Sequence, residues 1–316
     1  MGAYYTEYSE FLSALWPGLK VQKLSIDAGH NCPNRDGTLG TGGCIYCNNA
    51  AFSPAYCHEA GSVAAQIEEG KRFFAHKYPD MKYLAYFQAY TSTHAPLSEL
   101  INAYEEALDQ RDVCGLVVGT RPDCMPEELL HYLKEVNSKR VPVIVEYGAE
   151  TFNDKTLSLI NRHHTADCIR ETVCRTAEAG IPVGLHLILG LPGEDRSDMQ
   201  RSVKEACALP ISVLKFHQLQ IVKGTPLSGI WHSIREGKPL SATYTDFPDI
   251  RLFDLEDYLN LCVEIALSVP RQIAIERFTA QCPPALLEAP NWGLKNYQFT
   301  HKLYALLRKN TDTCNK

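Results

Sequence analysis

Pro142-Val-Ile-Val-Glu-Tyr-Gly148, the stretch 165–178 and Pro182-Val-Gly-Leu-His-Leu-Ile-Leu189 follow one another in this chain. The first and third are short apolar runs, and the stretch between them has the apolar spacing of a helix that covers a core. A strand, a helix and a strand in this order form one unit of a parallel sheet. Gly180 lies where the helix should end, because glycine favours the left-handed backbone found just beyond a helix. The unit therefore indicates an α/β fold.

Similar units continue on both sides of this one. The predicted strands are 21–28, 83–89, 115–119, 142–148, 182–189 and 213–219. The predicted helices between them are 63–77, 97–110, 126–137, 165–178 and 195–207. Six such strands predict a partial (β/α)6 TIM-like barrel of parallel strands. Functional side chains of such a barrel lie at the C-terminal ends of its strands and in the loops that follow.

The chain beyond the sixth strand differs in composition. Residues 224–249 are rich in Pro, Gly, Ser and Thr and predict a long irregular crossover. A helix at 252–267, a short strand at 272–278 and a final helix at 294–309 are expected after it. We therefore divide the chain into an N-terminal helical segment (1–19), a barrel (20–223) and a C-terminal extension that closes the barrel (224–316).

The composition is that of a globular chain. Its 316 residues are 45% apolar and 22% charged, which is enough for a complete α/β barrel. The net charge of -6 gives no basic footprint for a partner held mainly through phosphates. The 12 cysteines are scattered through apolar stretches, unlike the dense framework of a small secreted domain, so a reducing, cytoplasmic setting is expected. No apolar run reaches the length of a membrane span, and no membrane partner is expected.

Three cysteines lie in the loop after the first predicted strand, Asn31-Cys-Pro-Asn-Arg-Asp-Gly-Thr-Leu-Gly-Thr-Gly-Gly-Cys44-Ile-Tyr-Cys47-Asn48. Thiolates bind zinc or iron–sulfur clusters. Three protein ligands leave one position open for a substrate or cofactor, whereas a closed zinc site needs four. Glycines between Cys32 and Cys44 let the backbone approach sulfur closely. Three interpretations remain: a cluster on Cys32, Cys44 and Cys47, a zinc site completed by Cys57 in a nucleic-acid-binding module, or free thiols without a metal.

The loop resembles the cluster loop of radical S-adenosylmethionine (SAM) enzymes, in the group that includes the elongator catalytic subunit and the methylthiotransferases. The similar pattern is Cys32-Pro-Asn-Arg-Asp-Gly, then Gly-Gly-Cys44-x-Tyr-Cys47. Further segments resemble the YhcC-like family of bacterial radical SAM proteins in the same order: 83–93, 118–124, 154–163, 186–194 and 221–225. The resemblance covers about residues 20–290. The spacer between the first two cysteines is longer than in most radical SAM enzymes, as it is in the YhcC-like family.

This resemblance implies an enzyme with two cofactors, a [4Fe–4S] cluster and SAM. Cys32, Cys44 and Cys47 would bind three irons, and the amino and carboxylate groups of SAM would bind the fourth. Reductive cleavage of SAM would give a 5′-deoxyadenosyl radical that abstracts hydrogen from the substrate. The implied partners are a reductant such as flavodoxin or ferredoxin and an unidentified substrate, either a small molecule or RNA.

The resemblance also indicates residues that would contact SAM: Tyr46, Gln88, Thr91, Ser92, Glu150, Arg162, His186 and Gly190. Gln88, Thr91 and Ser92 follow the second strand, where polar capping of the strand end is an equal alternative. Glu150 and Glu146 lie on the same face of the fourth strand by alternation, so one of them could contact SAM while the other holds a loop. For Arg162 and His186 the alternatives are a solvated helix end and a buried, hydrogen-bonded imidazole.

Four polar residues near strand ends are candidates for catalysis or substrate binding: Arg121, Asp123, Lys215 and His217. Arg121 suits a carboxylate or phosphate of a ligand, and an ion pair between Arg121 and Asp123 is the structural alternative. Lys215 and His217 alternate onto one side of the sixth strand and so reach toward the substrate. The alternative for both is an ordinary charge at a strand end.

The C-terminal tail mixes cations with aromatic residues. Lys295, His301, Lys302, Arg308 and Lys309 alternate with Trp292, Tyr297, Phe299 and Tyr304. This mixture can stack on and hold nucleic acid. However, Trp292, Phe299, Leu303, Leu306 and Leu307 also form the apolar face of a helix, which favours a helix that closes the barrel.

Overall fold

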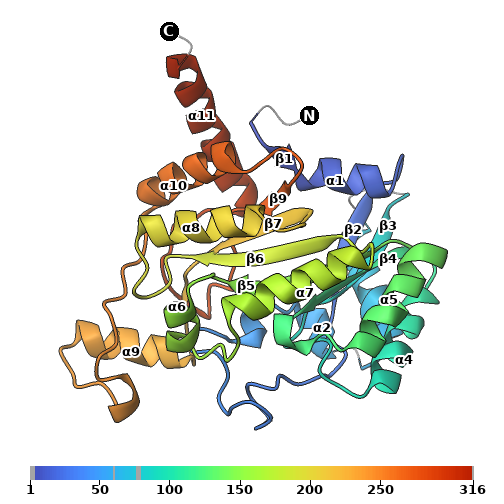
Figure 1. Cartoon of the computed structure of the whole chain (residues 1–316), viewed down its shortest axis with the longest axis horizontal. Helices are drawn as coiled ribbons and strands as arrows, with labels where there is room; N and C mark the ends of the chain where they lie inside the picture. The colour runs from blue at the N-terminus through green and yellow to red at the C-terminus, as the bar shows by residue number, and fades with distance from the viewer. Residues whose placement is uncertain (1–3, 60, 76–79, 315–316) are drawn as a thin grey trace.

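The computed structural model describes residues 4–59, 61–75 and 80–314 and contains a curved, eight-stranded sheet (Figure 1). Six neighbouring strands are all parallel and lie in chain order from one edge of the sheet: β2 (Val21–Ile26), β3 (Lys82–Phe87), β4 (Val113–Thr120), β5 (Val143–Glu150), β6 (Val183–Leu189) and β7 (Val213–Gln218). The predicted partial barrel of six parallel strands is confirmed, with boundaries that differ by a few residues.

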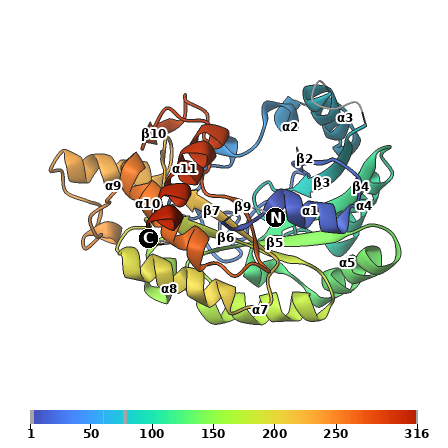
Figure 2. The ribbon, with the colours of Figure 1, turned by 90° about the horizontal axis from the view of Figure 1, so that it is seen from above.

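Helices connect these strands and lie around the outside of the curved sheet (Figure 2). They are α3 (Val63–Phe74), α4 (Leu97–Leu108), α5 (Glu127–Lys139), α7 (Ala166–Glu178) and α8 (Arg196–Cys207). All five were predicted, although residue 77, where the first was expected to end, lies outside the described residues. Two short helices, α2 (Ala55–Glu59) and α6 (Asp154–Leu159), had no prediction because neither is long enough to show a helical period.

Two strands from the ends of the chain extend the sheet beyond β7. β9 (Ala274–Arg277) pairs in parallel with β7, and β1 (Thr6–Glu7) pairs in parallel with β9. β9 confirms the short strand predicted after the sixth unit. β1 is followed by α1 (Tyr8–Leu15). The N-terminal residues therefore join the same sheet as the C-terminal part of the chain.

The prediction of an irregular crossover over 224–249 was wrong in its first half. α9 (Pro226–Arg235) begins directly after Thr225, whose side-chain oxygen accepts a hydrogen bond from the Ser228 amide. Pro226 at the first helical position and Thr225 before it are a helix start signal that the composition of the stretch obscured. Leu227 and Ile230, one turn apart, bury the inner face of α9. Beside it, β8 (Ile221–Val222) and β10 (Leu287–Ala289) form a separate antiparallel pair.

The last helix packs on the helix before it. α11 (Asn296–Cys314) buries Phe299, Leu303 and Leu307 in the main core, near α10 (Leu255–Ser268). The Phe299 ring lies 5.7 Å from the ring of Tyr258 on α10. The apolar face predicted for the tail is thus a packing surface. No described helix is both long and apolar enough to cross a bilayer.

Candidate functional site

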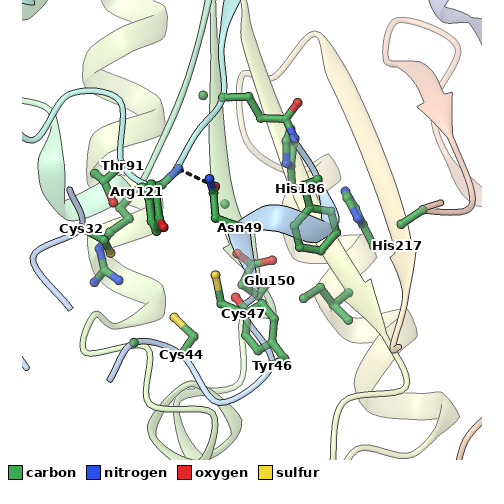
Figure 3. Close-up of a pocket in the computed structure, with 18 of the residues that line it drawn as sticks. Cys32, Cys44, Tyr46, Cys47, Asn49, Thr91, Arg121, Glu150, His186 and His217 are labelled. Atoms are coloured by element: carbon green, nitrogen blue, oxygen red, sulfur yellow. Dashed lines mark hydrogen bonds between the residues drawn. The ribbon is translucent and has the colours of Figure 1, made fainter. Parts of the chain in front are cut away.

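A cavity lies at the C-terminal ends of the parallel strands, under the cysteine loop (Figure 3). Side chains from the ends of β3 to β7 line one part of it, and the loop supplies the rest. Of the cysteines, Cys32, Cys44 and Cys47 all face it. The cavity therefore lies where functional residues of a parallel barrel gather.

The cysteine loop is folded by its own backbone. The Cys32 carbonyl accepts hydrogen bonds from the amides of Arg35 (2.8 Å) and Asp36 (3.1 Å), which close a tight turn after the first cysteine. Gly43 has a φ of 81° and donates its amide to the Asn34 carbonyl at 2.7 Å. This left-handed backbone favours glycine and brings Cys44 back toward Cys32. The spacer is an ordered turn-rich loop.

Two asparagines tie the loop to the segment after α6. Asn34 Nδ2 donates to the Asn161 carbonyl at 2.6 Å, and Asn161 Nδ2 donates to the Gly43 carbonyl at 2.8 Å. Asn161 has a φ of 59°, a left-handed conformation that asparagine tolerates better than most residues. The sequence indicated that Arg162, the next residue, would contact SAM, but it gave no signal for these two hydrogen bonds.

Arg162 follows Asn161 and turns into the cavity wall. Its Nη2 donates to the Gly148 carbonyl at 2.5 Å and lies 3.3 Å from Glu150 Oε1. Its Nη1 lies 3.6 Å from Cys44 Sγ. The solvated helix end considered as the alternative for Arg162 is excluded, since the side chain is only 8% exposed.

Cys32 and Cys44 are buried, Cys47 is half-buried, and all three line the cavity. The pKa of the Cys47 thiol is raised to about 11, mainly by burial and to a smaller extent by the nearby Cys44 thiol. Arg35 opposes this increase. Arg35 Nη2 also donates to the Cys47 carbonyl at 2.8 Å. Without a metal the Cys47 thiol therefore holds its proton near pH 7, and ligation would have to release it.

The four-cysteine zinc site is not present in this geometry. Cys57 donates its thiol to the Ser25 carbonyl at 3.1 Å and does not line the cavity. Within the described parts of the chain, no three His, Cys, Asp or Glu side chains converge closely enough to hold one metal ion. A fourth ligand for a tetrahedral zinc is therefore missing from the cysteine loop.

The candidate SAM-binding residues divide into two groups. Six of them line the cavity: Tyr46, Gln88, Thr91, Glu150, Arg162 and His186. Ser92 does not, because its hydroxyl points away and donates to the Gly119 carbonyl at 2.8 Å. Gly190, with a φ of 89°, also lies outside the lining and packs near the Phe253 ring. Thr91 Oγ1 is buried without a hydrogen-bond partner, so it could receive a polar group of a ligand.

Arg121 and Asp123 form the ion pair considered as the structural alternative. Arg121 Nε and Nη2 donate to the two Asp123 oxygens at 2.9 and 2.8 Å, and Nη2 also donates to the Arg162 carbonyl at 2.7 Å. Arg121 is only 2% exposed but still lines the cavity, and its Nη1 is buried without a partner. One guanidinium nitrogen therefore remains available to an anionic group.

The opposite wall of the cavity carries two imidazoles. His186 on β6 and His217 on β7 both line the cavity, and their ring centres lie 5.6 Å apart. His186 Nε2 lies 2.8 Å from Glu146 Oε2, and Arg277 Nη2 lies 3.3 Å from His217 Nε2. Burial lowers the pKa of both imidazoles, helped by Lys215 at His186 and by Arg277 at His217. The two rings are therefore neutral near pH 7.

Lys215 lies behind this wall, in a buried ionic cluster. Glu146 accepts hydrogen bonds from Lys215 (3.2 Å) and from the Tyr86 hydroxyl (2.7 Å), and it also pairs with Lys23. Burial alone would raise the pKa of Glu146, but Lys215 and Lys23 hold it well below the usual range. The fourth charge is Glu276 on β9, which lies 3.3 Å from Lys215 Nζ. Lys23, Tyr86 and Glu276 had no sequence signal.

The cavity thus has two different sides. The three cysteines and Arg121 lie on one side, and the neutral imidazoles of His186 and His217 lie on the other. Arg162 belongs to the first side, because its Nη1 lies 3.6 Å from Cys44 Sγ. The first side suits a thiolate-bound metal group with an anionic ligand. The second suits a substrate that is held by hydrogen bonds away from water.

Family models match most of this architecture, from the cysteine loop to α11. The Radical SAM superfamily model matches residues 30–206, and the Radical_SAM C-terminal domain model matches residues 211–309. The uncharacterized protein YtqA of Bacillus subtilis is 34% identical over 281 residues, which are 89% of this chain and 83% of YtqA. Protein YhcC of Escherichia coli K12 is 36% identical over 275 residues, which are 87% of this chain and 83% of YhcC.

A solved structure supports the fold independently. The structure of archaeal Methanocaldococcus infernus Elp3 with its N-terminus deleted superposes with a TM-score of 0.65 at 14% identity. The match covers 93% of this chain but 64% of that chain. At this identity the likeness concerns the fold, and it agrees with the parallel partial barrel described above.

Proposed function

Because this chain belongs to the radical SAM superfamily, we propose that it is an enzyme that binds a [4Fe–4S] cluster and SAM and abstracts hydrogen from a substrate held in the barrel. The observation that carries the proposal is the shared position of Cys32, Cys44 and Cys47 around one cavity at the ends of the strands. The only property proposed for the substrate at this point is that it binds in the same cavity.

The residues around the cavity fit these cofactors. In a cluster each cysteine binds a different iron, so its ligands surround a volume, whereas the ligands of a single zinc ion converge on one point. All three cysteines line one cavity without converging on a single metal-ion position, which supports the first arrangement. The unpartnered Arg121 Nη1 and Thr91 Oγ1 are suited to the carboxylate and amino groups of an amino-acid ligand such as SAM.

The chain's own residues would hold and shield the reaction. When bound and reduced by one electron, the cofactors supply a 5′-deoxyadenosyl radical that removes a hydrogen atom from the substrate. Tyr46, Gln88 and Glu150 would orient SAM from the cavity wall, and His186 and His217 would hold the substrate opposite it. The curved sheet around them would limit the access of water to a reactive centre.

Iron and product analysis test this proposal. Protein reconstituted anaerobically should be brown, bind about four irons as expected for a [4Fe–4S] cluster, and release 5′-deoxyadenosine when reduced with SAM present. Cys44→Ala should abolish the cluster. Cys57→Ala should leave it intact, because the Cys57 thiol is hydrogen-bonded to the Ser25 carbonyl outside the cavity. Colourless wild-type protein, or equal iron loss in both variants, would contradict the proposal.

The substrate class and the electron donor belong to the same proposal. A low-potential carrier such as flavodoxin or ferredoxin would supply the electron, and the substrate would be a small molecule or RNA. RNA is supported by one surface, the exposed face of α11 with Tyr297, His301 and Lys302. Crosslinking in cells, followed by anaerobic purification of wild type and of the triple alanine variant at these positions, distinguishes the two classes. RNA bound equally by both proteins would remove α11 from the proposal.

The three-part division of the chain is also proposed. Residues 1–19, 20–223 and 224–316 would be an N-terminal segment, a barrel and an extension that closes it. Limited proteolysis tests this division, and primary cuts inside β3 to β6 would contradict it.

A further inference from the structure

The guanidinium of Arg162 lies against one of the three proposed cluster ligands. Its Nη1 is 3.6 Å from Cys44 Sγ, within the range of an N–H···S hydrogen bond. Asn34 Nδ2 is a second donor to the same sulfur, at 3.4 Å. Cys44 is itself buried, so both donors act on a sulfur that is shielded from water. Hydrogen bonds to a ligand sulfur are among the factors that set the reduction potential of a cluster.

Several features hold Arg162 in this orientation. Its Nη2 bridges the Gly148 carbonyl (2.5 Å) and Glu150 Oε1 (3.3 Å). Glu150 has a φ of 65° at the point where the pairing of β5 with β6 shifts register. A Cβ at Gly148 would lie 2.7 Å from both Arg162 Nη2 and Glu150 Oε1, so glycine leaves room for this pair. Ending a β-strand requires neither the positive φ of Glu150 nor the space at Gly148, so both features point to the placement of the Arg162–Glu150 pair.

The sign of the electrostatic effect follows from the charges. Reduction adds one electron, and therefore one negative charge, beside Cys44. A nearby cation and N–H donors stabilise that charge, whereas a carboxylate next to the cation offsets part of the effect. Arg162 should therefore raise the reduction potential of the cluster, and Glu150 should make this increase smaller.

We propose that Arg162 is a positioning residue that acts through the Cys44 sulfur to raise the reduction potential of the cluster, and that Glu150 moderates this effect. The inference rests on the proposed function, because it requires a cluster on Cys32, Cys44 and Cys47. The electron comes from a low-potential one-electron donor, and no bond is made or broken in the step.

Potentiometric titration followed by electron paramagnetic resonance tests the inference. The reconstituted protein is titrated without SAM, with titanium(III) citrate as reductant. A contact between Glu150 and SAM then cannot affect the measured potential. Arg162→Met should lower the ratio of reduced to oxidised cluster at a fixed potential about tenfold, a negative shift of about 59 mV for one electron. Arg162→Lys keeps the charge and should recover most of this loss. Glu150→Gln should shift the potential in the opposite, positive direction.

The opposite signs separate an electrostatic role from a structural one. Arg170→Met is the matched control, because Arg170 lies on α7 and pairs with Asp167 and Glu205 outside the cavity. Equal potentials in wild type, Arg162→Met and Glu150→Gln would overturn the inference, as would shifts of the same sign in the two variants. If Arg162→Met takes up no iron, Glu150→Gln decides alone, and no positive shift overturns the inference. Wild-type protein that binds no cluster would instead remove the proposed function.

Discussion

Lys215 Nζ lies 3.2 Å from Glu146 Oε2 inside the barrel, where neither side chain is more than 3% exposed. Lys23 and Glu276 complete a cluster of two cations and two carboxylates, with Lys23 Nζ 2.7 Å from Glu276 Oε2. The cluster is neutral overall, which is the condition under which buried charges are tolerated. It also supports His186, whose Nε2 bonds to Glu146 from the cavity side.

Lys215→Met should destabilise the protein by about 3–5 kcal/mol, because it leaves two buried carboxylates with one cation. The free energy of unfolding of the metal-free protein, measured in urea, checks this value. Lys204→Met on the exposed side of α8 is the control and should change stability by less than about 0.5 kcal/mol. Similar losses in both variants would mean that the cluster contributes little.

Two glycine substitutions should act in opposite directions. Gly148→Ala places a methyl group 2.7 Å from Arg162 Nη2 and Glu150 Oε1, and crowding of this kind costs about 1–3 kcal/mol. Gly229 lies within α9 with open space around it, so Gly229→Ala should stabilise the protein by about 0.5–1 kcal/mol. Chemical denaturation of both variants checks the signs. A stabilising Gly148→Ala would show that the Arg162 pair moves freely.

His164 should make stability depend on pH below about 6.5. The pKa of His164 is lowered to about 3, mainly by burial and to a smaller extent by the positive charge of Arg162. In the unfolded chain the pKa of an imidazole is about 6.5. Between these two values the unfolded chain binds a proton that the folded protein does not, so the free energy of unfolding falls as the pH drops. His164→Gln should remove up to about 1.4 kcal/mol per pH unit of this slope.

Denaturation in urea at several pH values between 7.5 and 5 measures that slope. His131→Gln is the matched control, because the His131 side chain is 69% exposed on α5. An unchanged slope in His164→Gln would contradict the buried, neutral state of that imidazole.

The last helix, α11, should contribute to the stability of the protein only through its buried face. Leu303 is fully buried on α11, and truncation to alanine should cost about 2–5 kcal/mol. Tyr297 is 68% exposed on the same helix, so Tyr297→Ala should leave stability nearly unchanged. Thermal unfolding of the two variants makes the comparison. A small effect of Leu303→Ala would mean that α11 is not needed to close the core.

The sequence predicted the parts of the fold that carry local signals. Short runs such as 143–147 and 183–189 are mostly apolar, interrupted only by Glu146 in the first and by Gly184 and His186 in the second, and the strands follow from them. α9 was missed because Pro226 and Gly229 made its stretch look like a loop, although Pro at the first helical position is a start signal.

The site was only partly predictable, because its partners come from distant parts of the chain. Lys23 and Glu276 are separated by 253 positions and Arg162 and Cys44 by 118 positions, so no local pattern could pair them. The cysteines were found because their spacing is local. Ser92 and Thr91 are neighbours, yet one turns toward Gly119 and the other faces the cavity, a difference set by backbone direction.

The position of β1 has a consequence for how the chain is made. Thr6 pairs with Ala274, and its hydroxyl donates to the Arg271 carbonyl across 265 positions. At about 5–20 residues per second of synthesis, the start of the chain waits roughly 13 to 53 s for its neighbour in the sheet. In the last part of that interval, after β7 (Val213–Gln218) is made and before β9 (Ala274–Arg277) follows, the edge of β7 is open to wrong pairing. Among the strands of this sheet, β1 is thus the first to be made and one of the last to be paired.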